Sequence, residues 1–401
     1  MNLFLQYGHG MLTMTKDLCK QWGNGGVILS PRDMTILQMR NLTSSLKNLS
    51  AITMLDPQLY NPRGTHHGLA KYDFWPSNYN TSIFWGSEAS STMMQKLYEL
   101  NKYVGTSFFL LPGIHAIKAD DDFFAVQESI LDDAEAYGCE HSKFATICLS
   151  YEMLKDEEQL EKVANSASKW HVCGYYIVPE YHSGDYLKED PIWLLNLINF
   201  CWSLKLHKRQ VFVGYANHQM LCLALAKVDA LISGTWLNVR SFSTDKFDEP
   251  TEDSISRRVK WYYCPQALSE FKLPFLDIAQ KNNVLETMRP DPELQTYEAD
   301  ILFSGAAPSD TDYAEQQSFK HYLTALRSQA IASSSFSSFD ETLKFQYEIL
   351  NRAKKTLSFL HAHGVRGQAR DFYDYIDVNL SILDTLKLSR GFAMKMQWNS
   401  F

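Results

Sequence analysis

The sequence lacks any C-x-x-C pair, and its seven cysteines are an odd number. They stand at positions 19, 139, 148, 173, 201, 222 and 264. An odd and dispersed set argues against a disulfide framework, and the missing pairs argue against a four-cysteine zinc site. Cys148 and Cys222 lie inside apolar runs, where a cysteine acts as a small hydrophobic residue. These absences favour a protein that folds in a reducing compartment.

Long apolar runs and a basic excess are missing as well. No stretch of about 18 apolar residues occurs, and the start from Met1 to Leu5 carries no positive charge, so we expect neither a membrane span nor a secretory signal. We therefore expect a soluble, cytoplasmic protein. Its net charge of −8 gives no global attraction for nucleic acid. A nucleic-acid function would need a local patch or a protein partner, such as a second copy of the chain.

The sequence also has no P-loop, and no G-x-G-x-x-G follows its first apolar run, which argues against a doubly wound nucleotide-binding sheet. What it does contain is a short apolar run, a polar turn and an amphipathic stretch, repeated along its first two thirds. Most of these runs are continuously apolar, as strands covered on both faces are. Eight such repeats predict an α/β fold, a TIM (β/α)8 barrel. The expected strands are 3–6, 27–30, 52–55, 107–111, 145–149, 175–178, 211–214 and 230–233.

Two insertions interrupt the repeats, at 60–86 after the third expected strand and at 241–258 after the eighth. Long loops inside a compact domain are often lids or binding loops. Amphipathic links between the strands predict helices. The clearest of these are 156–170, 191–206 and 218–227.

The strand and helix alternation stops near residue 285, where proline and glycine clusters begin. A serine-rich linker at 333–338 then precedes two expected helices, 339–363 and 368–386. We therefore expect the barrel at residues 1–285 and a helical C-terminal domain at 286–401.

Three carboxylates directly follow expected strands: Asp56, Glu152 and Glu180. Catalytic groups of TIM barrels lie at these strand ends, so we expect the three acids in one mouth. Grouped carboxylates suit glycosyl chemistry, in which one stabilises a cationic sugar and another of raised pKa moves the proton. The alternative for each acid alone is a helix N-cap or a solvated loop residue. Their equivalent positions favour the catalytic interpretation.

Other polar and aromatic residues also follow the expected strands. Arg32 and Arg240 can hold a phosphate or a carbonyl by paired hydrogen bonds, or form ion pairs with nearby acids. Tyr215 and Trp236 can stack on a base or cap the barrel mouth. Histidines 66, 67, 182 and 218 show no metal-ligand spacing, so we expect no metal site and no cofactor.

The stretch from Val211 to Arg240 reads VFVGYANHQMLCLALAKVDALISGTWLNVR. It resembles the tRNA-guanine transglycosylase segment in which an MGVG strand leads through a helix to GVDMFDCVLPTR. Upstream, 174–180 (GYYIVPE) is similar to the family's GYAIGGLAVGE, and 55–58 (LDPQ) stands where the family has TDSGGF. Relatives that insert 7-deazaguanine into DNA also have a strand ending in Ser-x-Arg, close to 28–33, and then an LDSG strand. The resemblance covers roughly residues 1–280.

The resemblance implies roles for several residues. Asp56 corresponds to the aspartate that contacts the reacting base and ribose, and Glu180 to the glutamate of the VGE turn. Gly214 corresponds to a glycine that lets a base approach the backbone, and Arg240 to the arginine after the nucleophile strand. We also place Gln58 and Asn217 in the expected substrate-binding set.

The sequence departs from the family at three places. The family's nucleophilic aspartate is replaced by Ile232, and its C-x-C-x-x-C zinc motif is absent, with only Cys264 in that region. The family's DSGG has become 56–58 (DPQ). Base exchange through an aspartyl-ribosyl intermediate is therefore not implied. Either another acid (Asp229, Glu152 or Glu180) replaces the nucleophile, or the pocket binds without exchanging.

The sequence thus supports a transglycosylase-like enzyme that acts on the N-glycosidic bond of a purine in nucleic acid or a nucleotide. Asp56 and Glu180 would be its principal acids. One alternative is a non-catalytic subunit that binds nucleic acid or a purine within a larger assembly, such as a DNA-modification or antiviral system. Another is a glycoside hydrolase or nucleosidase on the same scaffold.

Overall fold

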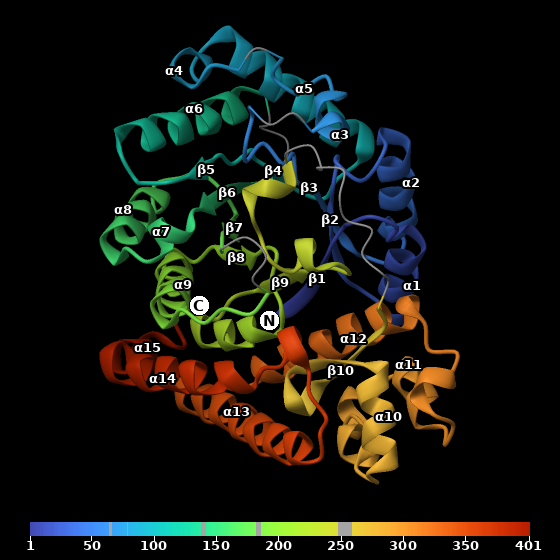
Figure 1. Cartoon of the computed structure of the whole chain (residues 1–401). Helices are drawn as coiled ribbons and strands as arrows, with labels where there is room; N and C mark the ends of the chain where they lie inside the picture. The colour runs from blue at the N-terminus through green and yellow to red at the C-terminus, as the bar shows by residue number, and fades with distance from the viewer. Residues whose placement is uncertain (64–65, 78, 138–141, 182–185, 248–258) are drawn as a thin grey trace.

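The computed structural model describes all residues except 64–65, 78, 138–141, 182–185 and 248–258. A ring of parallel strands lies at its centre, with helices around it (Figure 1). The strands are β1 (Asn2–Gln6), β2 (Gly26–Leu29), β3 (Ile52–Leu55), β4 (Phe109–Leu110), β5 (His115–Ala116), β6 (Lys143–Leu149), β7 (Gly174–Pro179), β8 (Gln210–Val213) and β9 (Ala230–Ser233).

The strand order is β3-β2-β1-β9-β8-β7-β6-β4, and β5 pairs further along β6. Between β3 and the start of β4, the Ser107 N–H donates to the Thr53 carbonyl at 2.7 Å, which brings the two ends of the sheet together. The Thr53 N–H donates in turn to Ser107 Oγ at 3.0 Å. All eight expected strands are confirmed, and the fold is a nearly closed TIM barrel.

Helices follow the strands and cover their outer faces. Asp156 caps α8 by accepting from the Gln159 N–H, and α9 opens with Pro191 after Asp190, whose side chain accepts two backbone N–H groups. The expected helices at 156–170 and 191–206 are confirmed, whereas 218–227 forms a 3-10 helix. The barrel helices are α1 (Leu12–Trp22), α2 (Ile36–Lys47), α5 (Glu88–Val104), α6 (Asp121–Tyr137), α7 (Tyr151–Leu154), α8 (Glu157–Ala167), α9 (Pro191–Lys205) and η1 (His218–Ala226).

Aromatic side chains fill the barrel interior. The Phe212 ring lies 5.1 Å from Phe4 and 4.8 Å from Phe144, between ring centroids. Two strands carry glycine to make room: a Cβ on Gly26 would lie 2.2 Å from Phe4, and one on Gly174 would lie 2.3 Å from Phe144. The barrel is therefore a packed core, and chemistry is confined to its ends.

The insertion after β3 holds two short helices, and 3-10 turns complete the loops. These elements are α3 (His67–Ala70), α4 (Thr81–Phe84), η2 (Leu237–Val239) and η3 (Thr244–Phe247). Among the described residues, none of the helices combines the length and apolar character that crossing a membrane requires.

After the barrel, the chain forms an antiparallel hairpin and further helices, which lie against one side of the barrel (Figure 1). The hairpin and α12 were not expected from the sequence. Helix α13 confirms the expected helix at 339–363, and α14 begins five residues later than expected, at Tyr373. The elements are β10 (Trp261–Cys264), η4 (Pro265–Ala267), β11 (Ser269–Lys272), α10 (Leu273–Lys281), η5 (Leu285–Met288), η6 (Pro292–Leu294), α11 (Tyr297–Asp300), η7 (Ile301–Phe303), η8 (Pro308–Asp310), α12 (Glu315–Ser333), α13 (Phe339–Ala362), η9 (Gln368–Arg370), α14 (Tyr373–Ser389) and α15 (Gly391–Gln397).

Candidate functional site

Asp56 directly follows β3 and lies buried at the carboxyl end of the barrel, with 1% of its surface exposed. Its Oδ2 accepts from the Tyr60 hydroxyl at 2.7 Å and from the Tyr215 hydroxyl at 3.5 Å, and its Oδ1 accepts from the Gln58 N–H at 2.9 Å. Burial raises the pKa of Asp56 to about 6, although these hydrogen bonds and the nearby Lys246 act in the opposite direction. The carboxyl therefore exchanges its proton near neutral pH.

Gln58 joins the end of β3 to the end of β2. Its backbone is left-handed (φ 57°), and its Oε1 accepts from Ser30 Oγ at 3.1 Å and from the Arg32 N–H at 3.2 Å. The Arg32 guanidinium contacts Asp33 at 3.4 Å and donates to the Lys246 carbonyl at 3.1 Å. The ends of β2 and β3 therefore lie together, as expected. The Arg32 guanidinium, which was expected to bind substrate, already contacts two protein groups.

The loop after β9 folds back over the mouth and places Lys246 there. The Lys246 Nζ lies 3.3 Å from the centre of the Tyr215 ring, 4.7 Å from Phe242 and 5.2 Å from Phe247. It also donates to the Asn238 carbonyl at 3.1 Å. Sequence reasoning missed Lys246 because it sits in a polar loop with no motif. Its place after the eighth strand was the one available signal.

Glu180 directly follows β7 and pairs with a histidine. Its Oε2 lies 2.8 Å from His115 Nε2 and accepts from the Tyr151 N–H at 3.3 Å, while its Oε1 accepts from Thr244 Oγ1 at 3.4 Å. Burial alone would raise the pKa of Glu180, but the hydrogen bond and charge of His115 and the backbone donors outweigh it and hold the pKa below its ordinary value. His115 escaped sequence reasoning because it belongs to a strand of only two residues.

The charges of Asp56 and Glu180 both influence one thiol in the barrel interior, that of Cys148. The buried thiol of Cys148 on β6 has its pKa raised first by burial and then by the charges of Glu180 and Asp56. Glu152 behaves differently: it is exposed in the first turn of α7, whose N-cap is Ser150. Unlike the buried Asp56 and the half-buried Glu180, Glu152 therefore faces solvent at the start of this short helix.

Two residues that were expected to bind substrate instead contact other parts of the protein. A Cβ on Gly214 would lie 2.4 Å from Tyr176 Oη, so the open side of this glycine receives the protein's own tyrosine and leaves no room for a base. Asn217 caps η1: its Oδ1 accepts from the Gln219 N–H at 2.9 Å, and its Nδ2 donates to the Tyr186 carbonyl at 2.8 Å. Both residues have structural roles here.

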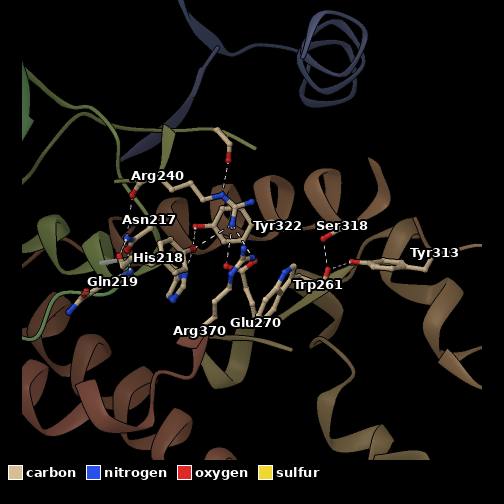
Figure 2. Close-up of polar contacts among 12 residues, drawn as sticks. Asn217, His218, Gln219, Arg240, Trp261, Glu270, Tyr313, Ser318, Tyr322 and Arg370 are labelled. Carbon is tan, nitrogen blue, oxygen red and sulfur yellow. Dashed lines mark hydrogen bonds and ion pairs between the residues drawn. The ribbon is translucent and has the colours of Figure 1, made fainter. Parts of the chain in front are cut away.

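Arg240 lies away from the acids, in a buried network that Figure 2 shows. It is 2% exposed, its Nη1 lies 3.2 Å from Glu270, and its guanidinium stacks 3.5 Å above the Tyr322 ring centre. Arg370 contacts the same carboxylate at 2.8 Å. Burial raises the pKa of Glu270, but the two arginines outweigh it and bring the pKa to about 2. Arg240 therefore binds the C-terminal hairpin, and the expectation that it holds substrate is wrong.

Trp236 also packs on the C-terminal part. Its ring meets Phe319 of α12 edge-on at 5.0 Å, and 36% of its surface is exposed. Tyr215 alone of the two expected stacking residues lies beside Asp56. Among the described residues, no group of three histidine, cysteine or acidic side chains is placed to hold a metal ion.

The fold and the site define a TIM-barrel protein with two carboxyls at the mouth. No family model and no curated protein matches the sequence. Among solved structures, the chain is similar to two of the carboxyl transferase domain of Rhizobium etli pyruvate carboxylase, one with pyruvate and biocytin and one with pyruvate. Identity is 11% and 12%, with TM-scores of 0.36 and 0.35. The alignments include 97% and 98% of this chain but only 60% and 61% of the two solved chains. Similarity at this level supports no conclusion about chemistry.

Proposed function

We propose that this protein is an enzyme that breaks the N-glycosidic bond of a purine in nucleic acid or a nucleotide. One observation carries the proposal: two carboxyls at the same end of the barrel have pKa values shifted in opposite directions. The pKa of Asp56 is raised to about 6, and that of Glu180 is lowered. Such a split pair is the usual arrangement for one acid that donates a proton and one that stays ionised.

The proposed roles follow from the contacts of each carboxyl. Protonated Asp56, held by Tyr60 and Tyr215, gives its proton to the departing base. Ionised Glu180 stabilises the positive charge that develops on the sugar, and the adjacent His115 positions water for attack.

The resemblance to guanine transglycosylases supplies the purine in this proposal. Its aspartate nucleophile is not available here, because Ile232 stands at that position and lies fully buried in the barrel interior. The proposed reaction is therefore release of the base rather than exchange through an aspartyl intermediate.

A second candidate is a non-catalytic subunit that binds nucleic acid or a purine within a larger assembly. The observation that favours it is that aromatic rings enclose the Asp56 carboxyl. The Phe242 ring lies 5.0 Å from both Tyr60 and Tyr215, and the carboxyl beneath them is 1% exposed. Catalysis at Asp56 requires these rings to move aside, whereas binding of nucleic acid to the outer surface does not.

Base release distinguishes the two candidates. Purine release from nucleosides, single-stranded DNA and tRNA would be followed by chromatography for Asp56→Asn and Glu180→Gln. General acid-base groups contribute about 10²–10⁴-fold, so we expect each variant to lose at least about 100-fold. Asp132→Asn and Glu128→Gln, both exposed on α6, are the matched controls and should keep full activity.

Circular dichroism would verify that each variant is folded. Wild-type protein that releases no base from any of these substrates, yet binds one of them, would leave the subunit as the better conclusion. Activity that survives in both acid variants would refute the assignment of the two carboxyls.

A further inference from the structure

A cleft lies at the opposite end of the barrel from Asp56, where β6, β7 and β8 begin. It has a volume of about 610 Å³ and includes the segment from Ser168 to Cys173, which joins α8 to β7. No carboxylate is among its described lining residues, although the protein as a whole has a net charge of −8. The basic side chains that line it are Lys143, Lys169, His171 and Arg209.

Arg209 is a cation of this cleft that the fold leaves without a partner. Its residue is partly buried, and among the described residues its guanidinium forms no hydrogen bond and no ion pair. It lies beside the Cys173 thiol: burial raises the pKa of this thiol to about 11, while a backbone hydrogen bond and the Arg209 charge act in the opposite direction. A guanidinium has five N–H donors, and covering such a group without a partner is costly. An anion in the cleft would supply the missing partner.

The other basic residues differ in how far the protein already uses them. The Lys143 amine pairs with the exposed carboxylate of Glu135, so its charge is largely neutralised. Lys169 and His171 are exposed, and neither side chain has an ion pair or hydrogen bond among the described residues. Their charge and N–H groups are therefore available together with those of Arg209.

Helix ends explain part of this set but not Arg209. A cation just after a helix interacts favourably with the helix dipole, and Lys169 closely follows the end of α8 at Ala167. Arg209 follows the end of α9 at Lys205 by a full turn, and the effect of the dipole fades within one turn. The unpartnered guanidinium therefore needs another explanation.

The lining suits phosphate groups better than bases. The planar arginine fork matches the oxygens of a phosphate, and lysine adds a point charge. The indole ring of Trp170 is 5% exposed and belongs to the hydrophobic core, so it cannot stack on a base. Contacts to phosphates alone hold a strand without reading its sequence.

We propose that this cleft binds the phosphodiester backbone of a nucleic-acid strand, with Arg209 as the main contact and Lys169 and His171 beside it. The inference goes beyond the proposed function, because the cleft lies at the amino ends of the strands and no bond is made or broken there. It also provides the local positive charge that an acidic protein needs in order to bind nucleic acid.

Fluorescence anisotropy with a labelled single-stranded oligodeoxynucleotide tests the proposal. Arg209→Gln and Lys169→Gln should each weaken binding about tenfold, as the loss of one hydrogen bond to a charged group does. Each should also lower the slope of log affinity against log salt by about 0.7, the value for one phosphate of a single strand. Lys281→Gln, an exposed position on α10, should change neither quantity. Arg209→Lys keeps the charge and should keep the salt slope, which separates a lost contact from a folding defect.

The competing results are distinct. An affinity that Arg209→Gln leaves unchanged would place the strand elsewhere on the protein, the Asp56 mouth included, and would overturn the inference. Wild-type protein that binds no oligonucleotide would overturn it as well. So would tripolyphosphate that binds at Arg209 and is not displaced by the oligonucleotide, because the cleft would then serve a free polyphosphate. Base release from nucleosides does not involve this cleft, so that assay decides the proposed function separately.

Discussion

The ionisation of Asp56 predicts how the stability of the protein depends on pH. Its carboxyl is 1% exposed, and its pKa rises from an ordinary value of 3.8 to about 6 on folding. Between these two values the folded protein holds a proton that the unfolded chain has lost. The free energy of unfolding therefore falls as the pH rises through this window, and the full cost of the buried charge is present above it.

The size of the effect follows from the shift. A rise of about two pKa units corresponds to about 3 kcal/mol, and about 2 kcal/mol of this develops between about pH 4.5 and pH 7.5. Asp56→Asn keeps an oxygen for the Gln58 N–H and offers Tyr60 a donor in place of the carboxylate. The measured quantity is the free energy of unfolding of Asp56→Asn minus that of the wild type. We expect this difference to be more positive at pH 7.5 than at pH 4.5 by about 2 kcal/mol.

Urea unfolding at both pH values, followed by fluorescence, measures the difference. Asp132→Asn, exposed on α6, is the control and should change stability equally at both pH values. If the stability difference between Asp56→Asn and the wild type is the same at both pH values, the carboxyl ionises normally in the folded protein. Its use as a proton donor near neutral pH would then be refuted.

Two further predictions concern the residues that the fold uses structurally. Gly214→Ala places a methyl group against Tyr176 and should destabilise the protein by about 1–3 kcal/mol in urea unfolding, because the packed ring has to move; an unchanged midpoint would mean that the tyrosine moves freely. Glu270→Gln leaves the buried Arg240 and the half-buried Arg370 without their carboxylate and should cost about 3–5 kcal/mol, whereas a loss below about 1 kcal/mol would show that water replaces the carboxylate.

The eight strands could be predicted because each is a continuous apolar run between polar turns, which is what burial on both faces requires. The positions of Asp56 and Glu180 followed directly from those strand ends. The exposure of Glu152 could not be predicted in the same way, because a strand end alone does not say where a side chain points, and the Ser150 cap starts a helix there.

The site residues that the sequence did not predict lie outside any apolar or amphipathic repeat. His115 lies on a two-residue strand, and Lys246 in a polar loop, so neither has a periodic neighbourhood that a sequence reader can use. Gly214 and Arg240 match the transglycosylase pattern by position, but their contacts depend on Tyr176 and on the C-terminal hairpin. Contacts between distant segments are what single-sequence reasoning lacks.

The carboxylate shared by Arg240 and Arg370 links the stability of the barrel to that of the C-terminal part. Arg240 comes from the last barrel loop, Glu270 from the hairpin and Arg370 from the tail, so three stretches of sequence complete one buried electrostatic unit. A protein shortened before the hairpin would lose Glu270, Arg370 and the Tyr322 ring together, and Arg240 would keep neither its carboxylate nor its stacking partner. The barrel and the tail should therefore melt in a single cooperative step, and neither can be exchanged for a foreign segment without the other.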